Sequence, residues 1–183
     1  DIVISNIDYE LFSKRTKIPV SFREKHSRVI AILTTLYDKM PIKLSTISNK
    51  TNIKETDVKK ILENLIEKNF VSKVKNKYVR EINFFTKKNI VIEAKLTKWK
   101  RGLQQAYRNR LYAQKSYVIL DKKQSNGARK NIKEFKKSNI GLGIMDRKTN
   151  KLDILCKPSL NKSVSNYFYW LASEKIYDKY IND

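Results

Sequence analysis

Residues 91–120 of this chain read VIEAKLTKWKRGLQQAYRNRLYAQKSYVIL, and their pattern is the main evidence for its fold. It starts within an apolar, β-prone run that covers residues 89–96. A basic amphipathic helix is predicted over residues 99–113, and a second apolar strand over residues 116–120. Strands and helices continue to alternate up to residue 160, which predicts an α/β core.

The first of these strands carries two opposite charges. Side chains alternate between the two faces of a strand, so Glu93 and Lys95 point to one face and Ala94 to the other. The chain contains other acid-x-Lys triplets, but this one lies inside an apolar run, where charged groups are costly to place. The pair therefore indicates a functional site. The alternative is an ion pair on an exposed edge strand, which would contribute little to stability.

The same stretch closely resembles the core of the PD-(D/E)xK nuclease superfamily, whose members place an acid-x-Lys on a central strand. Residues 140–145 (IGLGIM) and 152–156 (LDILC) are similar to the closing strands of such a core. The resemblance covers about residues 88–158. It implies a restriction-endonuclease-like mixed sheet flanked by helices, of α/β (α+β) class, and metal-dependent hydrolysis of phosphodiester bonds.

The resemblance also implies roles for individual residues. Glu93 and a second carboxylate would hold Mg²⁺ or Mn²⁺, and Lys95 would position the attacking water. Gln105 would be the helix glutamine that points back to the site. Where the Gln-x-x-x-Tyr form of the motif has its tyrosine, this chain has Asn109, and Tyr112 lies one turn beyond as a substitute.

The second carboxylate is expected at the start of the strand that precedes the acid-x-Lys strand. Asp1, followed by three apolar residues, fits this pattern best, and Glu81 and Asp8 are the alternatives. About eighty residues separate Asp1 from the Glu93 strand. We therefore expect the block between them to be inserted into the core, and an upstream part to supply the first helix and strand of the fold.

The intervening block, residues 21–80, resembles a winged helix-turn-helix. Its apolar spacing predicts a helix from residue 28 that ends before Pro41, a short helix capped by Ser45, a helix over 54–69 and a hairpin over 70–79. Such modules place the third helix in the major groove of DNA and the hairpin on the backbone. The alternative is a module for dimerisation or protein docking.

The chain has 183 residues, with 40 Lys+Arg against 18 Asp+Glu and a net charge of +22. Clustered cations displace counterions from phosphates, so this excess predicts a polyanionic partner. Residues 95–137 alone contribute +12. The candidate nucleic-acid ligands are Lys54, Lys59, Lys60, Lys73, Lys75 and Lys77 in the winged block, and Lys98, Lys100, Arg101, Arg108 and Arg110 beside Glu93.

Other classes of protein are disfavoured by the composition. One cysteine, Cys156, excludes a disulfide framework and a cysteine-based zinc site, and one histidine, His26, disfavours a histidine-based metal site. No apolar run reaches the ~18 residues that a membrane span needs, and the N-terminus has no signal-peptide features. We therefore expect a cytoplasmic protein with no membrane partner.

These observations combine into one functional hypothesis. Residues 1–20 would form the first strand of an incomplete nuclease-like core, residues 21–80 a winged helix, and residues 81–183 the rest of the core and an aromatic C-terminal helix. The predicted function is a metal-dependent DNA endonuclease that binds DNA through the winged helix, with a homodimer as an open possibility. One alternative is a non-catalytic winged-helix DNA-binding protein with a degenerate nuclease-like domain, and another is a nuclease that acts on RNA.

Overall fold

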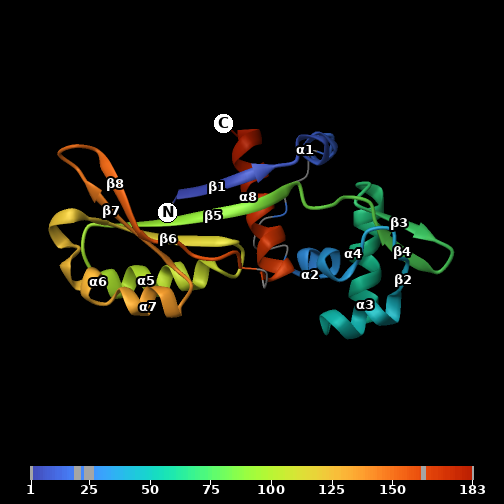
Figure 1. Cartoon of the computed structure of the whole chain (residues 1–183). Coiled ribbons are helices and arrows are strands. Elements are labelled where there is room, and N and C mark those ends of the chain that lie inside the picture. Colours follow the sequence, from blue (N-terminus) through green and yellow to red (C-terminus); the bar gives the residue numbers. More distant parts are fainter. Residues whose placement is uncertain (1, 19–21, 23–26, 162–163, 183) are drawn as a thin grey trace. The chain divides into compact units, whose positions relative to one another are not determined.

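The computed structural model of the chain describes residues 2–18, 22, 27–161 and 164–182. The chain folds into two compact units (Figure 1). The first comprises the described residues of Asp1–Asn6 and Lys88–Ser165, and the second those of Ile7–Lys87 and Asn166–Asp183. The C-terminal helix thus belongs with residues 7–87, not with residues 81–160 as predicted from the sequence.

The first unit is built on a five-stranded sheet in the order β1-β5-β6-β7-β8. β5, β6 and β7 are parallel, and β8 is antiparallel to β7. β1 and β5 are neighbours in this sheet although most of the second unit lies between them in the sequence. The strand bounds are β1 (Ile2–Ile7), β5 (Thr86–Lys95), β6 (Lys115–Asp121), β7 (Gly141–Asp146) and β8 (Lys151–Cys156).

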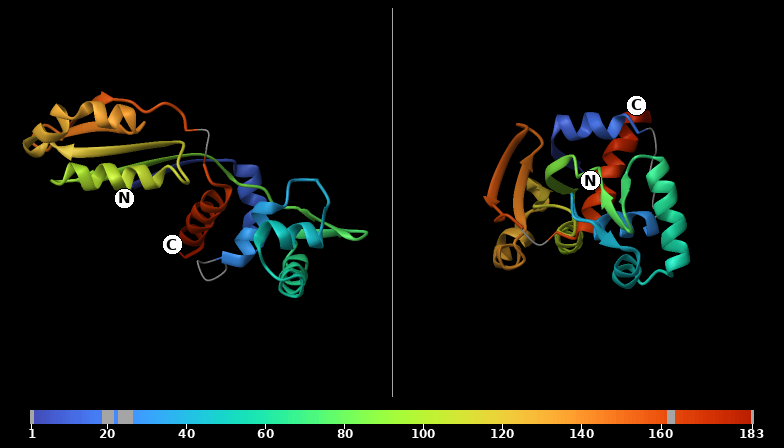
Figure 2. Two further views of the ribbon diagram at one scale, coloured as in Figure 1. Left: turned by 90° about the horizontal axis from the view of Figure 1, so that it is seen from below. Right: turned by 90° about the vertical axis from the view of Figure 1, so that its right-hand side faces the viewer.

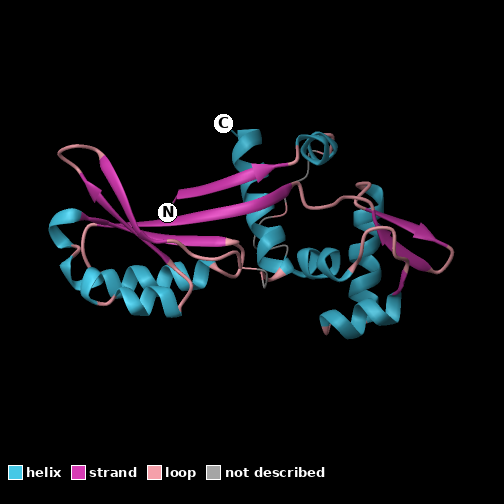
Figure 3. Cartoon of the chain, viewed as in Figure 1, coloured by secondary structure: helices cyan, strands magenta, loops and turns pink. Residues whose placement is uncertain are grey.

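Helices cover one face of this sheet (Figures 2 and 3). They are α5 (Trp99–Asn109), the 3₁₀ turn η2 (Lys122–Gln124), α6 (Asn126–Lys130) and α7 (Ile132–Lys137). Val118 of β6 and Leu142 of β7 are fully buried against Ala106, Ala128 and Phe135 of the three α-helices. The predicted class, a mixed α/β sheet flanked by helices, is confirmed.

The second unit combines helices with a three-stranded antiparallel sheet in the order β2-β4-β3. Its strands are β2 (Ile42–Lys43), β3 (Val71–Val74) and β4 (Lys77–Arg80). Its helices are α1 (Tyr9–Thr16), α2 (Ser27–Thr35), α3 (Leu44–Thr51), α4 (Glu55–Glu67) and α8 (Asn166–Asn182). Ile30, Ile47, Leu62 and Phe70 form its core, to which α8 adds Trp170.

The predicted helices and hairpin of residues 27–80 form, but α2 ends at Thr35, earlier than the predicted end at Pro41, and one predicted cap is wrong. Lys43, not Ser45, precedes the first turn of α3, and it makes no side-chain cap bond. The chain leaves β2 and enters α3 directly, which leaves Ser45 inside the helix. At its other end, α3 ends on Asn52 in the left-handed conformation, which asparagine tolerates better than most residues.

A buried ion pair holds α1 to α8 within the second unit. The side chain of Arg15 has no exposed surface, and its Nε and NH2 donate to the two carboxylate oxygens of Glu174 at 3.0 and 2.5 Å. The guanidinium also lies 3.7 Å from the ring centre of Tyr177 and 5.0 Å from that of Phe70. Burial raises the pKa of Glu174, although Arg15 acts in the opposite direction.

We expect the substitution Arg15→Ala to destabilise the second unit by about 3–5 kcal/mol, because it leaves the Glu174 carboxylate buried without its cation. Arg28→Ala is the matched control, since the Arg28–Asp57 ion pair is exposed and its loss should cost about 0–1 kcal/mol. Urea unfolding followed by circular dichroism measures both free energies. Equal losses in the two variants would contradict a special role for the buried pair.

Candidate active site

Glu93 lies on an interior strand and is buried. β5 has β1 on one side and β6 on the other, and Glu93 pairs with Val118 in the parallel register. Only 1% of Glu93 is exposed. The alternative of an ion pair on an exposed edge strand is therefore wrong, and the carboxylate needs partners that offset its loss of hydration.

Lys95 is the first of these partners. Its Nζ lies 3.1 Å from Glu93 Oε2, and its side chain keeps 27% exposure, so its ammonium group can still reach solvent. Glu93 Oε2 has this ion pair but no aligned hydrogen bond within the described chain. The stem of Lys95 packs on α5 where Gly102 allows a close approach, since a Cβ there would lie 3.2 Å from Lys95 Cγ.

Asn109 is the second partner, and it was not predicted. From the last turn of α5, its Nδ2 donates to Glu93 Oε1 at 3.0 Å, and the residue is only 8% exposed. Tyr112 donates its hydroxyl to Asn109 Oδ1 at 3.1 Å. Tyr112 therefore does not replace the motif tyrosine at Glu93, because Asn109 occupies that place and Tyr112 orients the amide.

Burial raises the pKa of the Tyr112 hydroxyl, and the negative charge of Glu93 raises it further. Tyr112 thus stays a hydrogen-bond donor at neutral pH. With its oxygen engaged by that donor, the Asn109 amide must present its NH₂ group to Glu93. The direction of each hydrogen bond in the row Tyr112–Asn109–Glu93 is therefore determined.

Asn89 anchors the strand that carries Glu93. This fully buried residue accepts a hydrogen bond from Ser5 Oγ of β1 at 2.7 Å and donates from its Nδ2 to the carbonyl oxygen of Tyr112 at 3.1 Å. Its backbone N–H donates to Gln114 Oε1 at 2.6 Å. These bonds join β1, β5 and the segment after α5, so they hold the backbone that presents Tyr112.

Gln105, the predicted helix glutamine, lies one turn before Asn109 on α5. Residues four apart share a helix face, so the side chain of Gln105 lies on the same side of α5 as Asn109. Its Oε1 is buried and has no hydrogen-bond partner within the described part of the chain. A buried acceptor of this kind calls for a partner, which an ordered water or a ligand could supply.

The second metal carboxylate remains a prediction. Asp1 lies outside the described residues. Asp8 caps α1 by accepting from the backbone of Glu10 and Leu11 at 3.1 and 3.2 Å, and it pairs with Lys87 at 3.0 Å. The backbone bond from Leu11 and the bond from Lys87 hold the Asp8 pKa below its ordinary value.

Glu81, the other alternative, accepts a hydrogen bond from Ser72 Oγ beside the hairpin. Among the described residues, no three His, Cys, Asp or Glu side chains gather as metal ligands do. Glu93 keeps a buried Oε2 that pairs with Lys95 but accepts no aligned hydrogen bond within the described residues. Glu93 fits a hard cation only if a second carboxylate joins it, for which Asp1 is the first candidate and Asp8 and Glu81 are the alternatives.

Most of the predicted nucleic-acid-binding residues of the first unit are exposed. Lys98, Lys100, Arg101 and Arg108 are exposed on or next to α5. Arg110 differs, because it is half-buried, donates to the carbonyl oxygen of Ser138 at 3.0 Å and lies 5.2 Å from the ring centre of Tyr107. Arg110 therefore joins the end of α5 to the end of α7, and this contact gives the residue a structural role.

In the second unit, the predicted ligands divide between a helix and a hairpin of different charge. Lys59 and Lys60 are exposed on α4, but this helix also carries four acids, so its net charge is −2. Lys54 precedes it and is exposed. The β3–β4 hairpin holds Lys73, Lys75, Lys77 and Arg80 with no acid over residues 71–80, and its three lysines are exposed. The hairpin is thus the more cationic surface.

No protein-family model, curated protein or solved structure matches this chain. Within the part of the chain that the structure describes, none of the helices has both the length and the apolar character of a bilayer span. Function must therefore be inferred from the chemistry of the site itself.

We expect Asn109→Ala to destabilise the first unit by about 1–3 kcal/mol, because Glu93 Oε1 would stay buried without a donor. Gln104→Ala is the matched control, since Gln104 is exposed on the same helix and its removal should change stability by no more than about 0.5 kcal/mol. Urea unfolding measures both. If the two variants had equal free energies of unfolding, the Asn109–Glu93 hydrogen bond would contribute nothing to stability.

Proposed function

We propose that this chain is a metal-dependent DNA endonuclease of the PD-(D/E)xK type. The observation that carries the proposal is the Glu93–Lys95 ion pair on an interior strand, in which Lys95 Nζ lies 3.1 Å from a Glu93 Oε2 that has no aligned hydrogen bond within the described residues. A buried ion pair is weak support for stability, since apolar residues of similar size often serve as well. Chemistry is the better reason to keep an acid and a base together there.

Each described residue has a role in this proposal. Mg²⁺ held by Glu93 and Asp1 would supply charge neutralisation at the scissile phosphate and a more acidic water. Lys95 would orient that water and stabilise negative charge, because its ammonium group lies at Glu93 and reaches solvent. Asn109 keeps Glu93 Oε1 in place, and Gln105 would bond the substrate through its unpaired Oε1.

The restriction-endonuclease-like core and the winged helix-turn-helix are part of the proposal. The core is supported by the mixed sheet in the order β1-β5-β6-β7-β8, with Glu93 and Lys95 on the strand next to β1. The winged helix is supported by the element order α2, β2, α3, α4 and the β3–β4 hairpin. This module is the reason for preferring duplex DNA to RNA as the substrate.

One observation favours a second candidate, a non-catalytic DNA-binding protein with a degenerate nuclease-like domain. Lys95 Nζ lies at the very oxygen, Glu93 Oε2, that a metal would use, and among the described residues no three His, Cys, Asp or Glu side chains gather as metal ligands do. In this candidate the ion pair would only neutralise the buried Glu93. The net charge of +22 suits both candidates, because it attracts a phosphate backbone whether or not that backbone is cut.

Cleavage assays distinguish the two candidates. We expect the wild-type chain to nick plasmid DNA with Mg²⁺ or Mn²⁺ and to stop when EDTA is added. Glu93→Gln and Lys95→Ala should lower the rate by about 100-fold or more while DNA binding is kept. Lys133→Ala, which removes an exposed cation from α7, is the control and should cleave normally.

If wild type and variants all bind DNA and none nicks it, the enzyme proposal is wrong and the binding protein remains. The same assay with an RNA of matching sequence decides the nucleic acid. Faster cleavage of RNA would replace DNA as the proposed substrate.

We expect the hairpin to contribute more to DNA binding than α4 does. Lys75→Ala/Lys77→Ala should weaken binding to a labelled duplex and lower the slope of log affinity against log salt by about 0.9 per lost phosphate contact. Lys59→Ala/Lys60→Ala removes the same charge from the net-acidic helix and should have the smaller effect. The reverse order would instead support insertion of α4 into the major groove.

A further inference from the structure

The C-terminal ends of β6 and β7 carry the same short pattern, an aspartate followed by two cations. After β6 it reads Asp121-Lys122-Lys123, and after β7 it reads Asp146-Arg147-Lys148. Asp121 accepts a hydrogen bond from the backbone of Lys123 at 2.8 Å, and Asp146 accepts one from the backbone of Lys148 at 3.0 Å. The two turns are thus built alike.

The two turns are joined by crossed ion pairs. Asp121 Oδ2 lies 2.6 Å from Arg147 Nε of the other turn, and Asp146 Oδ2 lies 2.8 Å from Lys122 Nζ. The bond from Lys122 and the backbone bond from Lys148 lower the pKa of Asp146. Each carboxylate therefore uses one oxygen for its own turn and the other for its neighbour.

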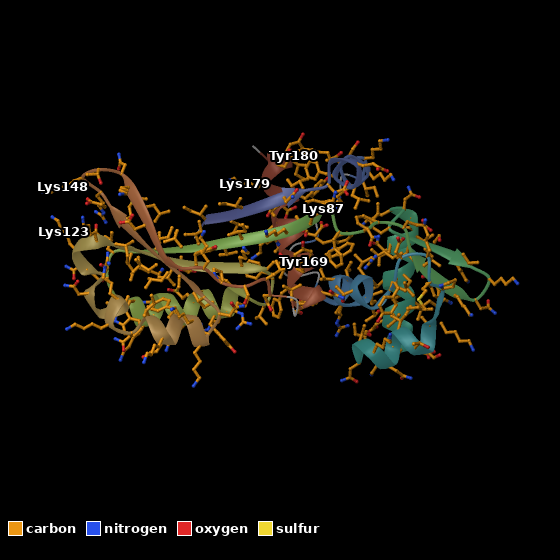
Figure 4. The ribbon with its side chains drawn as sticks, in the orientation of Figure 1. Lys87, Lys123, Lys148, Tyr169, Lys179 and Tyr180 are labelled. Carbon is orange, nitrogen blue, oxygen red and sulfur yellow. The ribbon has the colours of Figure 1, made fainter. Side chains whose placement is uncertain are left out.

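These six residues line one cavity of about 410 Å³, which we call the crossed-pair pocket. Its two carboxylates are already paired, so the remaining cations give it a net charge of +2. Lys123 and Lys148 are exposed, and neither forms an ion pair with the described acids. Figure 4 shows both lysines at the same end of the first unit.

The pocket opens at the same end of the sheet as the Glu93 site. Lys95 pairs with Leu120 on β6, and Asp121 is the next residue along that strand. Asp121 in turn pairs with Met145, which precedes Asp146 on β7. Neighbouring strands lie about 4.8 Å apart. The ends of β6 and β7, which carry the pocket, are therefore the next two strand ends in the sheet after the end of β5, which carries Lys95.

We propose that the crossed-pair pocket binds a backbone phosphate of the nucleic acid, next to the phosphate placed at Glu93. That this phosphate belongs to a nucleic acid rests on the proposed function, but its binding in the pocket does not depend on cleavage. A metal cation would have to displace Arg147 or Lys122 from the carboxylates, whereas a phosphate meets two unpaired lysines and leaves both ion pairs intact.

Binding of a fluorescent 20-base-pair DNA duplex, measured at several salt concentrations in EDTA, tests this proposal. The variant Lys123→Ala/Lys148→Ala leaves both ion pairs in place. We expect it to bind several-fold more weakly, with a salt slope smaller by about 0.9, the value for one lost phosphate contact. The control, Lys136→Ala/Lys137→Ala, removes the same charge from exposed positions on α7 and should keep the wild-type slope.

Equal losses in the two variants would show a general charge effect and overturn the proposal, as would wild-type binding by the pocket variant. Circular dichroism and the urea midpoint check that both variants are folded. The outcome is separate from that of the nuclease assay. Weaker binding by the pocket variant without cleavage by wild type would reject the enzyme and keep the pocket, while cleavage with unchanged binding would do the opposite.

Discussion

The buried carboxylate of Glu93 is the constraint on which the first unit depends. A carboxylate at 1% exposure is stable as an anion only if a cation and hydrogen-bond donors replace its lost water. Lys95 comes from the same strand and Asn109 from the end of the following helix. The connection between β5 and α5 is therefore organised around this charge. Gly102 lets α5 pack closely on Lys95 of β5 and Val118 of β6.

Two buried ion pairs among the described residues differ in a way that bears on function. In the second unit both oxygens of Glu174 are bonded by Arg15, whose guanidinium is enclosed by aromatic rings. In the first unit Glu93 keeps an oxygen without an aligned bond, and Lys95 reaches solvent. The Arg15–Glu174 pair has the features of a structural clamp. The Glu93–Lys95 pair leaves bonding capacity unused, as a site that receives a ligand must.

Positive charge is distributed unevenly among the elements of each unit. The exposed cations next to α5 and the paired turns after β6 and β7 lie in one unit with Glu93. In the other unit the hairpin is cationic while α4, the helix that a winged-helix reading would place in the groove, is net acidic. If this module binds DNA as proposed, its charges favour contact with the phosphate backbone over reading of bases.

The sequence predicts the order and kind of most elements, because periods of two and of three to four residues follow from local backbone geometry, but it does not predict α1 (Tyr9–Thr16). It also placed Glu93 and Lys95 on one face of an apolar strand. Only the tertiary structure decided which residues meet. Asn109 reaches Glu93 because of how α5 packs on the sheet, α8 joins the second unit through Trp170, and Asp121 finds Arg147 because β6 and β7 align in a particular register. Each of these contacts joins residues far apart in sequence, and local periodicity carries no information about packing or register.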